Sequence, residues 1–127
     1  MVSRLASELR PSRVPASTTA VDRGRDWEVP SEDPYLTGQF GAAMARGFEH
    51  HPADPSRLLG VLVPKHFLAY EVERNRHEYD DNVSRFDLMD SFLPGWRETI
   101  VEGGSHGAMC AYNSVASRND TFVACVV

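Results

Sequence analysis

The sequence predicts an α/β fold in which short, buried strands lie parallel to one another and alternate with amphipathic helices. Two continuous apolar segments are short enough to be strands covered on both faces, as in parallel sheets. Two longer segments repeat apolar residues at spacings of three and four, which indicates helices with one buried side. Their order along the chain, helix, strand, helix, strand, is typical of parallel α/β proteins.

The first helix is expected to begin at Pro34 and to end near His50. Asp33 can cap its first turn by accepting a hydrogen bond from a backbone N–H, and a proline at the first helical position leaves no donor unsatisfied. An apolar stripe should form the buried side of this helix. Its residues are Leu36, Phe40, Ala43, Met44 and Gly47.

The first strand is expected at residues 58–63, where leucine, valine and one glycine follow one another without a polar residue. A loop from Pro52 to Pro55 should precede it, since proline disfavours helical geometry in the residue before it. The strand should end at Pro64-Lys65-His66.

The second helix is expected to start after Ser84, which can cap it together with Asp87, and to stop at Gly103-Gly104. Its apolar stripe comprises Phe86, Met89, Leu93, Trp96 and Ile100. The second strand should lie at residues 107–112, and the charged connection from 71 to 81, with Asp80 and Asp81, should be a solvated loop.

Composition limits the partners of the chain. Its 127 residues are enough for one modest domain, and its formal net charge of -5 comes without a cluster of basic residues on one helical face. We therefore expect neither nucleic acid nor an anionic membrane as a partner. The N-terminus lacks the apolar core of a secretory signal, which leaves the localisation open. The five histidines lack the spacing of a zinc motif, so no metal or other cofactor is expected.

The polar residues that follow the two strands are candidates for a ligand site. Lys65 and His66 end the first strand, and Met109 to Asn113 close the second. Because ligands of parallel α/β proteins bind at the carboxyl ends of the strands, both groups should face the same rim. Lysine and histidine donors at fixed angles suit sugar hydroxyls. From composition alone, a solvated strand end with one structural hydrogen bond is the favoured interpretation of Lys65-His66.

Four segments together resemble the N-terminal barrel domain of family 3 glycoside hydrolases, which include β-xylosidases and β-glucosidases. They are GR followed by EVPSEDPYLTG within residues 24–38, PKHFLAY at 64–70, NVS through DL to FLP within 82–94, and MCAYN at 109–113. The resemblance covers residues 24–115 and implies part of a (β/α)8 TIM barrel. Residues 1–23 are then a disordered leader or a mispredicted start, and residues 116–127 a divergent, truncated tail.

Carried over residue by residue, the resemblance implies that Arg25, Lys65 and His66 bind hydroxyls of the sugar at the cleavage point. Met109 and Tyr112 would line the same subsite. The substrate of the full-length parent, a member of an often secreted family, would be a β-linked oligosaccharide or an aryl glycoside, with a β-xyloside or β-glucoside bond. Whether Cys110 and Cys125 pair stays open.

The same resemblance implies that the chain alone is inactive. Retaining glycoside hydrolysis needs one carboxylate as nucleophile and one carboxyl group as acid/base, and in this family both come from beyond the segments matched here. The main alternative is a non-catalytic sugar-binding or regulatory remnant. A further alternative is an unrelated small α/β domain, which would close its own sheet and melt cooperatively.

Overall fold

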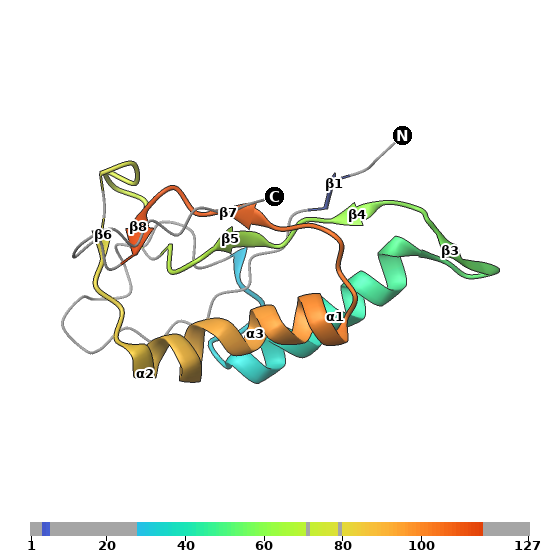
Figure 1. Cartoon of the computed structure of the whole chain (residues 1–127), viewed down its shortest axis with the longest axis horizontal. Helices are drawn as coiled ribbons and strands as arrows, with labels where there is room; N and C mark the ends of the chain where they lie inside the picture. Colours follow the sequence, from blue (N-terminus) through green and yellow to red (C-terminus); the bar gives the residue numbers. More distant parts are fainter. Residues whose placement is uncertain (1–3, 6–27, 71, 79, 116–127) are drawn as a thin grey trace.

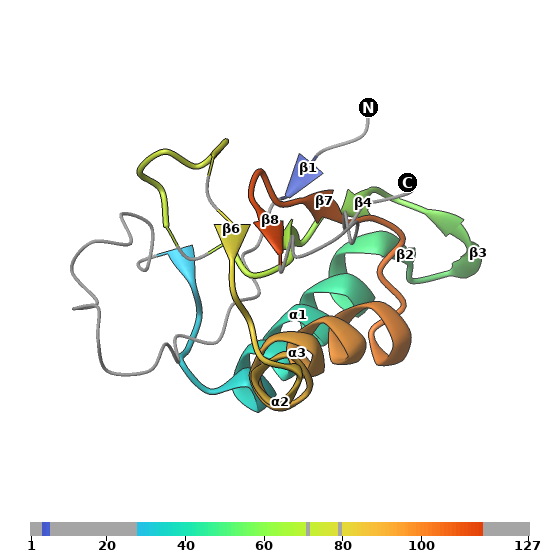
Figure 2. The ribbon, with the colours of Figure 1, turned by 60° about the vertical axis from the view of Figure 1, so that its left-hand side comes forward.

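Two helical segments lie against one side of a row of short strands, as the computed structural model shows for residues 4–5, 28–70, 72–78 and 80–115 (Figures 1 and 2). The described part of the chain is therefore mixed α/β, as expected, with helices and strands in separate layers. No helix in these described ranges is long and apolar enough to cross a membrane.

The first helix, α1 (Pro34–Glu49), begins where the sequence predicts. The Asp33 carboxylate accepts a hydrogen bond from the Tyr35 backbone N–H at 2.9 Å, and Pro34 occupies the first turn. This cap satisfies one of the donors that a helix start leaves without an internal partner.

The buried side of α1, however, is not the predicted apolar stripe. Leu36 and Phe40 are 54% and 47% exposed. The buried residues are mostly small: Thr37, Gly38, Gly41, Ala42, Ala45 and Glu49. The predicted stripe was wrong because the second helical segment packs on the side of α1 that carries small residues, where the two helices can approach closely. A Cβ on Gly38 would lie 2.8 Å from the Cβ of Glu98.

The second helical segment runs without a break from Arg85 to Glu102, as α2 (Arg85–Asp87), η3 (Leu88–Phe92), α3 (Leu93–Arg97) and η4 (Glu98–Glu102). Its predicted cap is present, because Ser84 Oγ accepts from the Asp87 N–H at 3.0 Å. The turns of η3 and η4 are π-helical, and Pro94, which cannot donate the usual helical hydrogen bond, follows the first of them. Gly104, at φ +72°, ends the segment as predicted.

The predicted stripe of this second segment is only partly buried. Trp96 is almost fully buried, whereas Phe86 and Met89 at its start are 74% and 61% exposed.

The first predicted strand is divided into several pieces. Strand β2 (His50–His51) pairs antiparallel with β3 (Asp54–Leu58), and a separate strand β4 (Val61–Leu62) follows. Leu58 and Leu59 are exposed, so the apolar run does not form one buried strand. β4 pairs in parallel with β1 (Arg4–Leu5), which falls in the segment expected to be a leader; the rest of residues 1–23 lies outside the described residues.

Lys65 and His66 lie within a strand rather than after one. Pro64 has no N–H to donate to a ladder, and the strand β5 (Lys65–Phe67) starts directly after it. β5 pairs in parallel with β7 (Met109–Cys110), which is shorter than the predicted strand 107–112. Parallel pairing is thus present as expected, but the partner of β7 is β5, which follows the strand predicted at residues 58–63. The Lys65–His66 and Phe67–Leu68 peptide bonds are cis.

The charged connection also contains a strand that the sequence did not predict. β6 (Asp80–Asp81) pairs in parallel with β8 (Ser114–Val115). The acidic pair is therefore part of a ladder and not simply a solvated loop, because backbone pairing in a short strand does not require apolar side chains.

The core lies between the second helical segment and the strands. Leu68, Ala69, Phe92, Trp96 and Val115 form one buried cluster. The Phe67 ring meets the Trp96 ring edge-on, with 4.9 Å between the ring centroids. This contact holds β5 against the helical layer, and β5 carries Lys65 and His66.

Candidate functional site

Four of the five predicted site residues come from the β5–β7 pair and its continuation. Lys65 and Met109 are direct register partners in the parallel ladder. The His66 and Tyr112 rings lie 5.7 Å apart between centroids. The fifth residue, Arg25, lies outside the described residues. The structure thus places Lys65 beside Met109 at the start of the β5–β7 ladder and His66 beside Tyr112, although these residues come from segments far apart in the sequence.

Lys65 makes an ion pair with Glu28. The ammonium nitrogen lies 2.9 Å from Glu28 Oε2, and both side chains are mostly buried, at 13% and 19% exposure. A partly buried pair of this kind holds the lysine in one position, whereas a solvated lysine would sample many rotamers. The bond to Glu28 agrees with the alternative of a strand end with one structural hydrogen bond, except that the Lys65 side chain is 13% exposed and therefore not fully solvated.

His66 is buried at 2% exposure among aromatic rings. The Tyr70 ring meets it nearly edge-on at 4.7 Å between centroids, and Tyr112 lies on another side. Tyr112 is 38% exposed, so this aromatic group reaches the surface through Tyr112. Rings with exposed edges and faces are suited to the apolar faces of sugars, and their polar atoms to hydroxyls.

Two residues that the sequence analysis did not select complete this cluster. The guanidinium carbon of Arg76 lies 4.4 Å from the centroid of the Tyr112 ring, and the His77 ring packs at 5.2 Å from the same ring. Arg76 also bonds Glu73 at 3.2 Å. Sequence reasoning could not single out Arg76, because it lies in a charged stretch that contains other basic residues.

Tyr70 is fully buried and donates its phenol O–H to the Glu73 carboxylate. Burial raises the pKa of this phenol above its ordinary value, and the hydrogen bond to Glu73 raises it further. The Tyr70 hydroxyl therefore stays protonated at neutral pH. Glu73 is held between this hydroxyl and the Arg76 guanidinium.

Asn113 connects the end of β7 to the end of β5. Its side-chain amide donates to the backbone carbonyls of Leu68 and Ala69 at 3.3 and 2.9 Å. Ala69 has a positive φ of 55°, so its backbone makes a sharp turn just before Tyr70. The amide thus fixes the turn that carries the Tyr70 ring. Cys110, in β7, is disulfide-bonded; the sequence has one other cysteine, Cys125, which lies outside the described residues.

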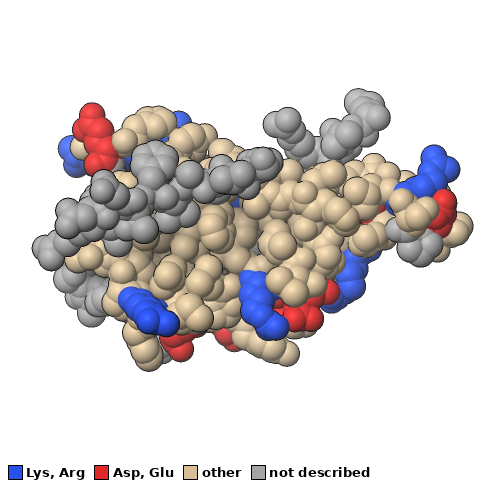
Figure 3. Space-filling view, viewed as in Figure 1, with Lys and Arg blue, Asp and Glu red and all other residues tan. Residues whose placement is uncertain are grey.

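A groove of about 1200 Å³ lies away from these residues, along the second helical segment. None of the predicted site residues lines it. Its apolar lining includes Phe67, Met89, Leu93, Trp96 and Ile100. In Figure 3 the charged side chains of the described residues lie mainly along the lower edge, where the helical segments run, and at the two ends of the molecule. The groove also holds Asp90, Arg97 and Glu98, but a lining that is mainly apolar suits packing against protein better than binding a sugar.

No group of three or more potential metal-binding side chains occurs among the residues that the structure describes. The cluster of Lys65, His66, Arg76 and Tyr112, which we call the rim cluster, therefore offers hydrogen-bond donors and aromatic surface. These are the groups of a binding site for a neutral polyol.

Comparison with known proteins agrees with this chemistry. The chain is 36% identical over 101 residues to a probable β-D-xylosidase 7 of Arabidopsis thaliana, covering 72% of this chain and 13% of that protein. It is 34% identical to a β-glucosidase of Paenibacillus barengoltzii of known structure, with a TM-score of 0.63 over 73% of this chain and 9% of that one. No family model matches the chain.

A further solved structure shares the fold over more of the chain. It is a GH3 exo-β-xylosidase in complex with a xylobiose aziridine probe; the TM-score is 0.68 at 24% identity, covering 90% of this chain and 14% of that one. The protein is thus a glycosidase homologue by fold and sequence. It belongs to the family 3 glycoside hydrolases and spans about 13% of the length of the curated relatives it matches.

Proposed function

We propose that this chain forms part of the sugar-binding rim of a family 3 (β/α)8 barrel. There it would orient the terminal xylose or glucose of a β-linked oligosaccharide or an aryl glycoside. The observation that carries the proposal is that Lys65 of β5 lies beside Met109 of β7, and His66 of β5 beside Tyr112, which follows β7. The related exo-β-xylosidase was solved with a xylobiose-derived probe, which supports a xylose-type sugar.

Each member of the rim cluster has a distinct task in this proposal. Lys65, held by Glu28, and Arg76, stacked on Tyr112, present charged donors to the sugar hydroxyls. A hydrogen bond to a charged donor contributes about 1.5–3 kcal/mol. Tyr112 offers its exposed ring to an apolar face of the sugar, while buried His66 supplies a directional nitrogen. Arg25, outside the described residues, would add a third cation.

We further propose that the chain alone does not hydrolyse glycosides. Retaining hydrolysis needs a free carboxylate to attack and a second carboxyl group to protonate the leaving oxygen. The two described carboxylates at the rim cluster are already engaged, Glu28 by Lys65 and Glu73 by Tyr70 and Arg76. Neither has the freedom that an attacking group requires.

A non-catalytic sugar-binding remnant is the second candidate function. It is favoured by the internal contacts of the rim cluster, in which Glu28 holds Lys65 and the packed rings hold His66 and Tyr112 in place. Isothermal titration of the isolated chain with xylose, glucose and their aryl glycosides separates the two. Binding without turnover supports the remnant; no binding and no cooperative melt support a part that needs the rest of a barrel.

A pair of variants tests the rim cluster itself. Lys65→Met should weaken sugar binding by at least about tenfold, since it removes one charged hydrogen bond. Arg97→Met is the matched control, because it removes an exposed cation paired with Glu102 at 3.1 Å and distant from the rim cluster. Equal affinities of the two variants, or release of free monosaccharide by the unmodified chain, would contradict the proposal.

A further inference from the structure

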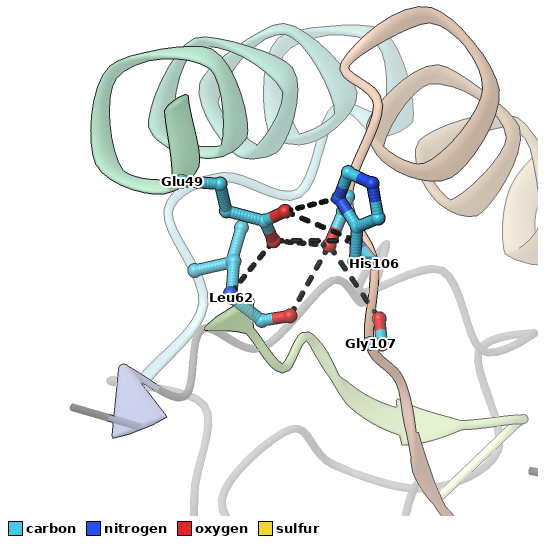
Figure 4. A network of polar contacts seen from close by, with 5 residues as sticks. Glu49, Leu62, His106 and Gly107 are labelled. Carbon is cyan, nitrogen blue, oxygen red and sulfur yellow. Dashed lines mark hydrogen bonds and ion pairs between the residues drawn. The ribbon is translucent and has the colours of Figure 1, made fainter. Parts of the chain in front are cut away.

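The most completely satisfied buried charge in the described residues lies outside the rim cluster. Glu49, the last residue of α1, is fully buried. One carboxylate oxygen accepts the Leu62 backbone N–H at 2.7 Å; the other lies 2.6 Å from His106 Nδ1. The His106 backbone N–H also points at the carboxylate, at 3.2 Å, and Ser105 Oγ lies 3.2 Å away (Figure 4).

The contacts of Glu49 are mostly with hydrogen-bond donors. The Leu62 and His106 backbone N–H groups donate to it, and the Ser105 hydroxyl and His106 Nδ1 lie within hydrogen-bond distance. A buried carboxyl group is costly unless such partners surround it, and here they do.

The network joins the two chain segments that lead into the rim cluster. Leu62 lies shortly before β5, and Ser105 and His106 shortly before β7. Ser105 Oγ also lies 3.2 Å from the Leu62 carbonyl oxygen. The segments touch so closely that a Cβ on Gly107 would lie 2.8 Å from that same oxygen. The next contact along the chain is the ladder bond from Met109 N–H to the Pro64 carbonyl, at 2.9 Å.

We propose that Glu49 is a positioning residue for the rim cluster. By holding residues 61–62 against 105–107, it sets the alignment of β5 with β7 and hence the distance between His66 and Tyr112. The role in sugar binding rests on the function proposed above, whereas the role in strand alignment does not. Because Glu49 touches neither residue of that ring pair, its effect passes through the backbone.

Three variants separate positioning from simple stabilisation. Glu49→Met keeps the length of the side chain but removes both acceptors. Glu49→Gln retains an acceptor for Leu62 and an amide that can pair with His106, so it is the conservative rescue. Thr37→Val is the control: Thr37 is also fully buried in α1, and it loses one hydrogen bond, to the Ser31 carbonyl, at the opposite end of the helix.

The readouts are the nuclear Overhauser contact between the His66 and Tyr112 rings, the melting temperature, and the affinity for xylose and glucose. Glu49→Met should lose the ring contact and weaken sugar binding by about tenfold or more, while Glu49→Gln stays close to wild type. Thr37→Val should lower the melting temperature but leave the ring contact and the affinity unchanged.

The proposal is overturned if Glu49→Met lowers only the melting temperature, or if Thr37→Val disturbs the ring contact equally. Should Glu49→Met not fold, His106→Ala decides, because His106 is half exposed and its removal spares the bond to Leu62; an unchanged ring contact in that variant counts against positioning. If the wild-type chain binds neither sugar, the second candidate function, a sugar-binding remnant, fails, and the ring contact still tests Glu49.

Discussion

Replacing Gly38 by alanine tests the close packing of the two helical segments, with Gly47→Ala as a control in the same helix. A Cβ at position 38 would lie 2.8 Å from Glu98 Cβ and 3.2 Å from the Gly95 Cα, closer than such atoms normally approach. A Cβ at position 47 would have no atom within 4 Å. The two substitutions change helix propensity equally, so the difference between them reports the contact.

The magnitudes follow from these distances. Alanine stabilises a helix over glycine by about 0.8–1 kcal/mol, and Gly47→Ala should gain that amount. Overpacking costs about 1–3 kcal/mol, so Gly38→Ala should show a net loss of up to about 2 kcal/mol. For a chain of this size about 1 kcal/mol shifts the melting temperature by roughly 4 °C. Gly47→Ala should therefore melt higher than wild type and Gly38→Ala lower.

Thermal melts followed by circular dichroism at the helical band measure both shifts, and urea denaturation gives the free energies. If Gly38→Ala gained as much stability as Gly47→Ala, α1 would not lie against Glu98 and Gly95, and the small-residue side of α1 would need another explanation.

Three further changes test the cap, the core and the buried phenol. Ser84→Ala removes the cap of the second helical segment and should cost about 1 kcal/mol in urea denaturation; no loss would mean that Ser84 does not cap it. Trp96→Ala, at a residue only 4% exposed, should cost about 3–5 kcal/mol and abolish the cooperative melt, and a retained melt would contradict the core described above. Because the pKa of Tyr70 is raised in the folded state, its stabilising contribution is present below the ordinary tyrosine pKa and is lost as the pH rises through the raised value. Tyr70→Phe should therefore lose less stability than the wild type as the pH becomes alkaline. If the stability of both proteins falls equally with pH, Tyr70 is not the cause of the fall.

The sequence predicted those features that depend on neighbouring residues. Asp33 with Pro34, and Ser84 with Asp87, cap the helices as expected, because a cap needs only a side chain and a backbone N–H two or three positions away. Gly104 ends the second helical segment for an equally local reason, its positive φ.

The sequence did not predict which side of α1 is buried. Periodicity favours large apolar residues such as Leu36 and Phe40, yet the neighbouring helix lies against Gly38 and Ala42. How closely another helix can approach α1 depends on the residues of that helix, which come about 60 positions later in the chain. The hydrogen bond between Gln39 and Glu98, for example, joins residues 59 positions apart. No window of local sequence contains that information.

Lys65, His66, Met109 and Tyr112 were selected from a resemblance and from predicted strand ends. Parallel pairing of β5 with β7 places Lys65 beside Met109, and His66 lies beside Tyr112. That these residues bind a sugar stays a prediction. Glu49 was not selected, because its partner His106 is 57 positions away and a glutamate at a helix end is ordinary in sequence.

The pairing of Lys65 with Met109 has a consequence for how the site forms. Register partners so far apart in sequence can meet only after the intervening helix has folded back, and such non-local pairing forms slowly compared with local turns. A synthetic peptide spanning β5 alone would have no site. Sugar that binds the assembled strands would in turn raise the melting temperature by mass action, so saccharide added during refolding should increase the yield of native chain.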